Sequence, residues 1–432
     1  MAPVVTGAPG TAAIVSASER PAARLPYMPG VDGLRALAVA AVFIFHAGAT
    51  WLPGGFLGVD VFLVISGYLI TALLLAEQRR SGRIDLKRFW IRRVRRLIPA
   101  LLVMIGGTLT AMVILHSGEV ARLKGAVLSS LGYVTNWYFV VADVPYFQRF
   151  ERPNVFLHLW SLAVEEQFYL LWPMVAALVV VVIGLRPWVL GLIAFAGVVA
   201  STWWGWHMYD PYELPWRIYY GTDTRAVGLL VGVVGAILLS PARLTPIASR
   251  LGRVLLDVVG LLALAGVLWC MVRIDEFNAP LYQGGFLKLS VATIVLIVVV
   301  AHPSSLAGRA FGWSVLVWIG ARSYGIYLWH WPVLMLTRPG QDVGMSGAPL
   351  LTIQFALAVG IAALSYRYVE MPIRRNGMAG LRAALSLRRA RVRERPWVAI
   401  VAWGVVGAVI ALIVVVAVLP EGPATIPGLG GR

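Results

Sequence analysis

The feature that most limits the fold of this chain is a series of apolar runs, each about as long as a lipid bilayer is thick. A helix needs about 20 mostly apolar residues to cross a membrane. Runs of that kind recur along the whole chain of 432 residues, of which 59% are hydrophobic and 13% charged. The short alternating strands of a membrane β-barrel are not visible in the sequence. The sequence therefore predicts an all-α fold, a polytopic bundle of membrane helices.

Eleven of these runs have the length of a membrane span. They lie at residues 31–52, 56–76, 97–115, 159–185, 188–206, 222–240, 253–272, 286–302, 313–336, 348–370 and 396–419. A twelfth stretch, 119–142, is interrupted by Arg122, Lys124 and Asn136. We interpret this stretch as a re-entrant or interfacial helix, so the prediction is a ten-helix core followed by one extra helix.

The basic residues predict how the bundle is oriented. The net charge is +17, and the connections 77–96 and 372–395 carry nine and eight Lys or Arg residues. Short connections rich in Lys and Arg stay on the cytoplasmic side. Eleven spans put both connections there together with the N-terminus, and put the C-terminus outside. We expect a multi-pass protein of the bacterial inner (plasma) membrane, and this placement of charge argues against nucleic-acid binding.

The same pattern predicts the domain organisation. The chain divides into a flexible cytoplasmic leader, a membrane core, an Arg-rich cytoplasmic linker, an extra transmembrane helix and an extracytoplasmic linker, at 1–29, 30–375, 376–395, 396–419 and 420–432. Cys270 is the only cysteine, which excludes an intrachain disulfide. The six histidines and the acidic residues are not spaced as metal ligands, so we expect no metal.

Ionisable residues inside the predicted spans are the candidates for chemistry. Ten apolar residues separate Arg35 from His46, so the two side chains share one helix face, about 16 Å apart along the axis. Such groups usually face the protein interior or a wet cavity. The alternative is an arginine that reaches the membrane surface and a buried histidine bonded to a backbone carbonyl. Asp60, Glu165 and Glu166 are expected near the outer ends of their spans.

Six segments resemble, in this order over about residues 30–375, the motifs of the acyltransferase-3 family of integral membrane acyltransferases. They read VDGLRALAVAAVFIFH, GVDVFLVISGYLI, FWIRRVRRLIPAL, WSLAVEEQFYLLWP, ARSYGIYLWHWPVL and SYRYVEMPIR. In the segment TDTRAVGLLVG, Val227 stands where the family often has an acidic residue, whereas Arg225 is kept. The resemblance implies an enzyme that moves an acyl group, often acetyl, from cytoplasmic acyl-CoA to a hydroxyl of an extracytoplasmic envelope glycan or glycolipid.

The resemblance also implies roles for particular residues. The acyl-CoA donor is expected to meet basic groups at the cytoplasmic mouth of a channel, namely Arg35, Arg92, Arg93, Arg95 and Arg96. Arginine is suited to fork-like contacts with phosphate. Membrane topology alone also favours arginine in this loop, which is the alternative explanation of the same residues.

His46 is the expected catalytic residue, either as a general base or as a transient acyl carrier. Glu165 or Asp60 is expected to orient its imidazole or to bind the sugar, with Glu165 favoured by its place in the motif. Further contacts to substrate are expected from four residues, Glu166, Trp160, Arg225 and His330. His330 and His158 also have a structural interpretation, as members of an aromatic belt at the membrane surface.

Two other functions fit parts of the pattern. A transporter or flippase of a polar lipid or glycan precursor would place buried charges along a substrate path, with broken helices in paired halves. A membrane anchor for an envelope complex would tolerate loss of His46. The extra helix 396–419 resembles that of family members with an extracytoplasmic SGNH-hydrolase-like domain, of which this sequence shows no motif. We expect such a domain as a partner, fused in a longer chain or separate.

Overall fold

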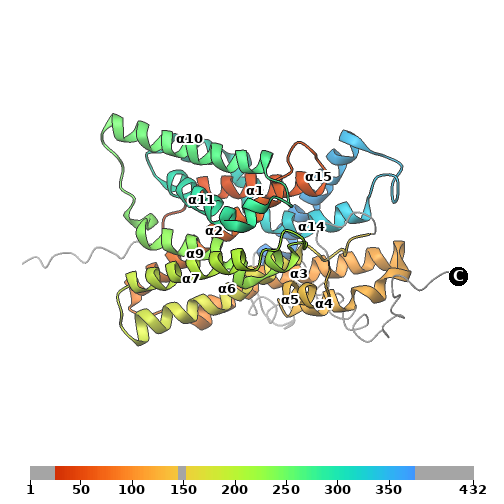
Figure 1. Ribbon diagram of the computed structural model, residues 1–432, viewed down its shortest axis with the longest axis horizontal. Helices are drawn as coiled ribbons and strands as arrows, with labels where there is room; N and C mark the ends of the chain where they lie inside the picture. The colour runs from red at the N-terminus through yellow and green to blue at the C-terminus, as the bar shows by residue number, and fades with distance from the viewer. Residues whose placement is uncertain (1–24, 145–151, 375–432) are drawn as a thin grey trace, which may run out of the picture.

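The computed structural model describes residues 25–144 and 152–374 (Figure 1). In these ranges the chain is built from helices, and its only β feature is an isolated bridge between Pro339 and Val343. Nine helices of the described part are long and apolar enough to cross a membrane. The fold is thus a polytopic helical bundle, as predicted. The predicted span 396–419 lies outside the described residues, as do its two flanking linkers and most of the leader.

The long helices lie roughly side by side along the longest dimension of Figure 1. They are α1 (Pro29–His46), α2 (Gly58–Ser81), α3 (Leu86–Leu115), α6 (Leu159–Ala177), α7 (Trp188–His207), α9 (Thr222–Leu238), α10 (Arg250–Arg273), α11 (Phe286–Ala301) and α15 (Gly347–Ser365). The shorter ones are α4 (Lys124–Leu131), α5 (Thr135–Val141), α8 (Trp216–Tyr220), α12 (Leu306–Phe311), α13 (Ser314–Ala321) and α14 (Ser323–Leu336). Single π-helical turns prolong α6 over Leu178–Val182 and α15 over Tyr366–Glu370.

The structure tests two of the predicted boundaries. Residues 119–142 form short pieces, ending in α4 and α5, and none of them has the length of a span, which confirms that this stretch is not a full crossing. The prediction of one continuous helix over 313–336 is wrong. The backbone leaves helical geometry at Arg322, with φ −106° and ψ 2°, and divides the segment into α13 and α14. The 14 residues of α14 are about 21 Å long, less than the hydrocarbon core.

Glycines let α1 and α2 approach their neighbours at backbone distance. A Cβ added at Gly67 of α2 would lie 1.9 Å from the carbonyl oxygen of Leu229 in α9. A Cβ at Gly320 of α13 would lie 1.8 Å from the carbonyl oxygen of Asp32 in α1. Small residues are the usual means of close helix packing in membranes, where apolar burial against lipid supplies little force. These contacts hold α1 and α2 rigidly inside the bundle.

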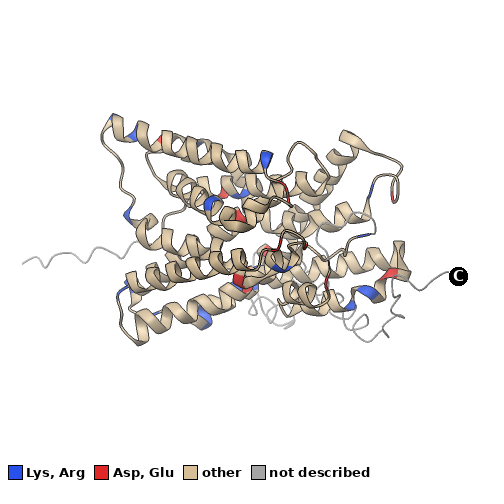
Figure 2. Cartoon of the chain, in the orientation of Figure 1, with Lys and Arg blue, Asp and Glu red and all other residues tan. Residues whose placement is uncertain are grey.

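Charged residues are sparse along the ribbon and lie mainly in connections and at helix ends, with a few in the centre (Figure 2). One cluster joins three connections around Asp342, which lies between α14 and α15. Arg152 Nη2 lies 2.6 Å from Asp342 Oδ1, and Arg338 Nε lies 3.0 Å from Oδ2. His116 Nε2, after α3, is 3.7 Å from the same carboxylate. We call these four residues the Asp342 clasp.

The Asp342 clasp predicts a stability that depends on pH. Burial raises the pKa of Asp342, but hydrogen bonds from Arg152 and Arg338 outweigh it and lower that pKa to about 2. An unfolded aspartate titrates near pH 4. The clasp therefore stabilises the fold fully above about pH 4, and this stabilisation is lost as the pH falls toward 2. We expect Asp342→Asn to lower the melting temperature in detergent at pH 7, and to lower it about half as much at pH 3, midway between the two pKa values.

The control for this measurement is Asp210→Asn. Asp210 is an exposed loop residue that accepts a backbone hydrogen bond from Tyr212. Its replacement should change the melting temperature little at either pH. A loss in Asp342→Asn that is equally large at pH 7 and at pH 3 would contradict the role assigned to the clasp.

Candidate active site

Three histidines from distant parts of the chain meet at the C-terminal end of α1. His46, the last residue of α1, places its Nδ1 atom 3.0 Å from Nε2 of His330 in α14. On the other side of the His330 ring, Nδ1 lies 2.5 Å from the carbonyl oxygen of Tyr327. The ring of His158 meets His330 edge-on at 5.5 Å, and Trp331 lies edge-on to His46 at 4.8 Å. We call His46, His330 and His158 the histidine cluster.

Exposure distinguishes the members of the histidine cluster. His330 and His158 have no exposed surface, whereas His46 is half-buried. The His158 ring is anchored by Nε2, 3.1 Å from the carbonyl oxygen of Leu328. Of the three histidines, His46 is therefore the one with exposed surface.

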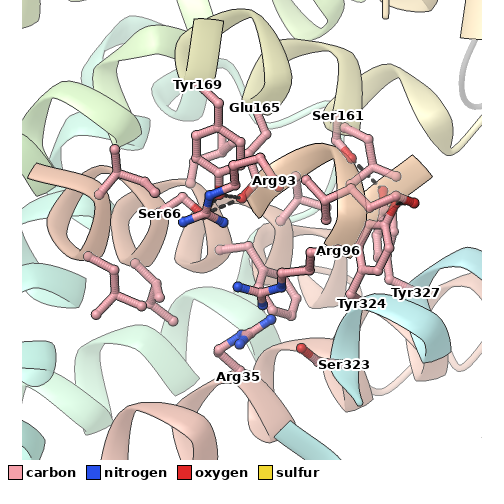
Figure 3. Close-up of a pocket in the computed structure, with 18 residues that line it drawn as sticks. Arg35, Ser66, Arg93, Arg96, Ser161, Glu165, Tyr169, Ser323, Tyr324 and Tyr327 are labelled. Carbon is pink, nitrogen blue, oxygen red and sulfur yellow. Dashed lines mark hydrogen bonds between the residues drawn. The ribbon is translucent and has the colours of Figure 1, made fainter. Parts of the chain in front are cut away.

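A pocket lies in the bundle between α1, α2, α3, α6 and α14 (Figure 3). Arg35 of α1 and Arg93 and Arg96 of α3 line it, and Figure 3 shows their guanidinium groups gathered around one space. This arginine pocket has the charge to hold an anionic ligand.

Glu165 of α6 lies in the wall of the arginine pocket. Its carboxylate accepts hydrogen bonds from the hydroxyl groups of Ser66 in α2 and Tyr169, one turn further along α6. The Tyr169 hydroxyl also donates to Ser66 Oγ at 2.9 Å. The guanidinium of Arg93 stacks on the Tyr169 ring, 4.6 Å from its centroid. Glu165 is thus held through its Oε1 atom by two hydroxyl groups, and its carboxylate offsets part of the positive charge of the pocket.

Tyr327 connects the arginine pocket with the histidine cluster. Its side chain lines the pocket, and its hydroxyl bonds to Ser161 Oγ at 2.6 Å and donates to the carbonyl of His158 at 2.9 Å. Its ring centroid is 5.1 Å from that of His330, and its own carbonyl contacts the His330 ring. The pocket and the histidine cluster therefore lie on two sides of one residue.

The structure separates the predicted donor-binding arginines into two groups. Arg93 and Arg96 are three residues apart, share one face of α3 and line the pocket with Arg35. Arg92 is exposed on another face, and its Nη2 lies 3.8 Å from Glu77 Oε2 of α2. Arg95 is not among the residues that line the pocket.

The predicted orienting residues of His46 lie elsewhere. Glu165 is held by Ser66 and Tyr169, and Asp60 forms a buried ion pair with Arg225, with Oδ1 and Nη2 2.8 Å apart. In the structure, His330 is hydrogen-bonded to the His46 imidazole. Residues 155–158, just before α6, are already buried, so α6 begins inside the bundle, and the depth of Glu165 relative to the membrane surface stays a prediction.

Two predicted substrate contacts belong to the protein interior. Trp160 is fully buried, with its ring 4.7 Å from that of Tyr219, and Arg225 lies over the Phe286 ring at 3.9 Å. Glu166 follows Glu165 in α6 and does not line the arginine pocket. Their contact with substrate stays a prediction. In the part of the chain that the structure describes, no group of three or more His, Cys, Asp or Glu side chains is arranged to hold a metal ion.

A bundle of membrane helices that brings a reachable histidine next to a cationic pocket has the organisation of an integral membrane transferase. Residues 28–367 match the family model described as an acyltransferase domain, Acyl_transf_3. The chain belongs to this acyltransferase-3 family.

Curated relatives support the family assignment. The chain is 40% identical over 351 residues to the peptidoglycan O-acetyltransferase OatA of Listeria monocytogenes, a match that covers 81% of this chain and 56% of that protein. It is 38% identical to the putative peptidoglycan O-acetyltransferase YrhL of Bacillus subtilis, covering 84% and 58%. A putative O-acetyltransferase of Staphylococcus aureus is 39% identical, covering 83% and 59%. The chain thus spans a little over half the length of these relatives. No solved structure matches it.

Proposed function

We propose that this chain is the membrane part of an O-acetyltransferase of the bacterial plasma membrane. It would move an acetyl group from cytoplasmic acetyl-CoA to a hydroxyl of an extracytoplasmic envelope glycan, with peptidoglycan as the first candidate because two relatives carry that name. The observation that carries the proposal is the position of Tyr327, which lines the arginine pocket and also contacts His330 of the histidine cluster. An SGNH-like domain, fused or separate, remains the proposed partner for the final acceptor.

The charge of the pocket supports a phosphate-bearing donor. Arg35, Arg93 and Arg96 face a single lining carboxylate, that of Glu165, so the pocket has more positive than negative groups. Arg35 also has Asp32 beside it, with Nη1 and Oδ1 3.6 Å apart, so its charge is balanced in part. The phosphates of a CoA thioester would bind these guanidinium groups, and its long flexible arm would carry the acyl group onward. Tyr327 and Ser161 mark the end of the pocket toward which that arm would extend.

The proposed chemistry needs one base at the reacting hydroxyl. As the acceptor oxygen attacks the thioester carbonyl, the unprotonated nitrogen of His46 takes the hydroxyl proton. The tetrahedral intermediate then collapses, the C–S bond breaks, and the CoA thiolate receives that proton from the imidazolium. The products are the acetyl ester and free CoA thiol, and His46 returns to its neutral form. In the alternative route the same nitrogen carries the acetyl group between donor and acceptor.

Two arginines of α3 line the pocket and two do not, which allows a matched test of donor binding. We expect Arg93→Gln/Arg96→Gln to weaken binding of a non-hydrolysable thioether analogue of acetyl-CoA by about 100-fold, since each charge-assisted hydrogen bond contributes about 1.5–3 kcal/mol. Arg92→Gln/Arg95→Gln removes the same charge from the same helix and should change the dissociation constant less than about threefold. Titration calorimetry of the purified protein measures both constants.

The two pairs of variants decide between a specific pocket and a general attraction of charge. Equal weakening by both pairs would contradict a pocket that binds the donor, because membrane-surface charge would then explain the affinity. Unchanged affinity in Arg93→Gln/Arg96→Gln would show that the arginine pocket does not bind the donor.

A further inference from the structure

Two successive hydrogen bonds connect the His46 ring to the backbone through His330. The first joins His46 Nδ1 to His330 Nε2 at 3.0 Å, and the second joins His330 Nδ1 to the Tyr327 carbonyl oxygen at 2.5 Å. A third histidine, His158, fixes the His330 ring from the side, with the two ring planes at 86°. The His330 ring therefore has its position and its orientation determined by three neighbours.

The second hydrogen bond determines which nitrogen of each ring carries a proton. A backbone carbonyl only accepts, so His330 Nδ1 must be the donor and carry the hydrogen. In a neutral imidazole the other nitrogen, Nε2, then has the lone pair and accepts. His46 Nδ1 must be the donor to it, which puts the lone pair of the neutral His46 ring on Nε2.

We propose that His330 is a positioning residue for His46. This inference rests on the proposed function, in which His46 takes a proton or an acyl group. His330 selects the Nδ1–H tautomer of His46 and fixes its ring plane, so that Nε2 is always the reacting nitrogen. When His46 becomes protonated, its Nδ1–H still has an acceptor, which stabilises the cation. A buried carboxylate has the corresponding place in serine hydrolase triads.

Burial favours this role over contact of His330 with substrate. Its side chain has no exposed surface, and both ring nitrogens already have partners inside the protein. The ring planes of His46 and His330 are only 26° apart, with centroids 5.2 Å apart, as a hydrogen bond in the plane of two rings requires. A purely structural histidine needs neither this ring alignment nor an acceptor directed at the reactive residue.

Two substitutions separate positioning from packing. His330→Leu removes the acceptor, and we expect kcat for acetyl transfer to fall about 100-fold with KM for acetyl-CoA within about threefold of wild type. His330→Gln places an amide oxygen near the former Nε2 position and should recover at least tenfold of this loss. His207→Leu, at an exposed histidine of α7, is the control and should leave both constants unchanged.

The kinetic outcomes are decisive in both directions. Equal loss of kcat in the Leu and Gln variants, with wild-type melting temperatures, would overturn the proposal because the acceptor would then be irrelevant. Full activity of His330→Leu would overturn it as well. A fall in kcat that Gln reverses supports it, because a packing defect would not depend on an acceptor atom.

A spectroscopic measurement keeps the proposal testable where the variants fail to fold. In wild-type protein with ¹⁵N-labelled histidine, assigned by comparison with His46→Gln, we expect the His46 signals of an Nδ1–H tautomer. An Nε2–H tautomer would overturn the inference. The result is independent of turnover. If the Nδ1–H tautomer is found but His46→Ala still transfers acetyl groups, the proposed function fails and the hydrogen-bonded pair stands.

Discussion

Replacing His46 with alanine should reduce acetyl transfer at least 100-fold, while the protein keeps its fold and its affinity for the donor. General-base catalysis contributes typically 10²–10⁴-fold, and a lost acyl carrier would cost at least as much. His46 is the last residue of α1 and is half-buried, so its removal leaves the packed interior of the helix intact. We therefore expect the melting temperature, and the affinity for the thioether analogue of acetyl-CoA, to stay close to wild type.

The measurement is best made in cells and with purified protein together. Cells that lack the gene are complemented with wild type or with His46→Ala, and mass spectrometry of the envelope glycans reads the acetyl ester. Purified protein reports donor binding by calorimetry. Wild-type ester levels in the variant would refute the role of His46 in either chemical route. Loss of donor binding together with the ester would show a folding or pocket defect instead, which the melting temperature would reveal.

Breaking the buried ion pair between α2 and α9 should have the largest effect on stability. Asp60 and Arg225 have 2% and 0% of their side chains exposed, and the guanidinium stacks on the Phe286 ring of α11. Arg225→Met leaves the Asp60 charge without its partner inside a membrane protein. Loss of one member of a buried pair costs about 3–5 kcal/mol. We expect a melting temperature lower by well over 10 °C or no recovery of folded protein in detergent.

The double variant Asp60→Leu/Arg225→Met is the matched control. Removing both charges together also removes the unpaired one, so most of the lost stability should return. If the double variant is as unstable as Arg225→Met alone, the shape of these side chains, and not their charge, holds the helices together. The recovered protein also tests the predicted catalytic role of Asp60, because full acetyl transfer without this carboxylate would exclude it from the reaction.

Much of the fold was predictable because membrane spans are defined by length and apolarity within one short window of sequence. The break at Arg322 could not be predicted, because apolar segments lie on both sides of it. The helix is interrupted there by the dihedral angles of a single residue. The depth of Glu165 relative to the membrane stays a prediction for a related reason. The residues before α6 fold back into the bundle, and hydropathy does not record where a helix starts relative to the membrane.

The candidate site was predictable in part. Arg35 and His46 share one helix, so their common face followed from helix geometry, and the pairing of Arg93 with Arg96 follows from their spacing of three. The contact between His46 and His330 joins residues 284 positions apart, and no periodicity reports such a contact. The contact between the His330 ring and Tyr327 could have been predicted from their spacing, because residues three apart on a helix are neighbours. Ser66 and Tyr169 are not among the predicted site residues, because the hydrogen bond between them joins two helices, α2 and α6.

The helix α1 touches α13 backbone to backbone near Gly320 and carries Arg35 and His46 without a break. Under the proposed function, it would therefore fix the distance between the bound anion and the reacting histidine. The distance between Arg35 and His46 along the helix axis is about 16 Å. A donor whose anionic group rests at Arg35 must carry its acyl carbon on an arm of that reach. Compact activated acids such as acetyl phosphate have the anion next to the carbonyl. Bound at Arg35, they would hold their carbonyl carbon too far from His46 to react.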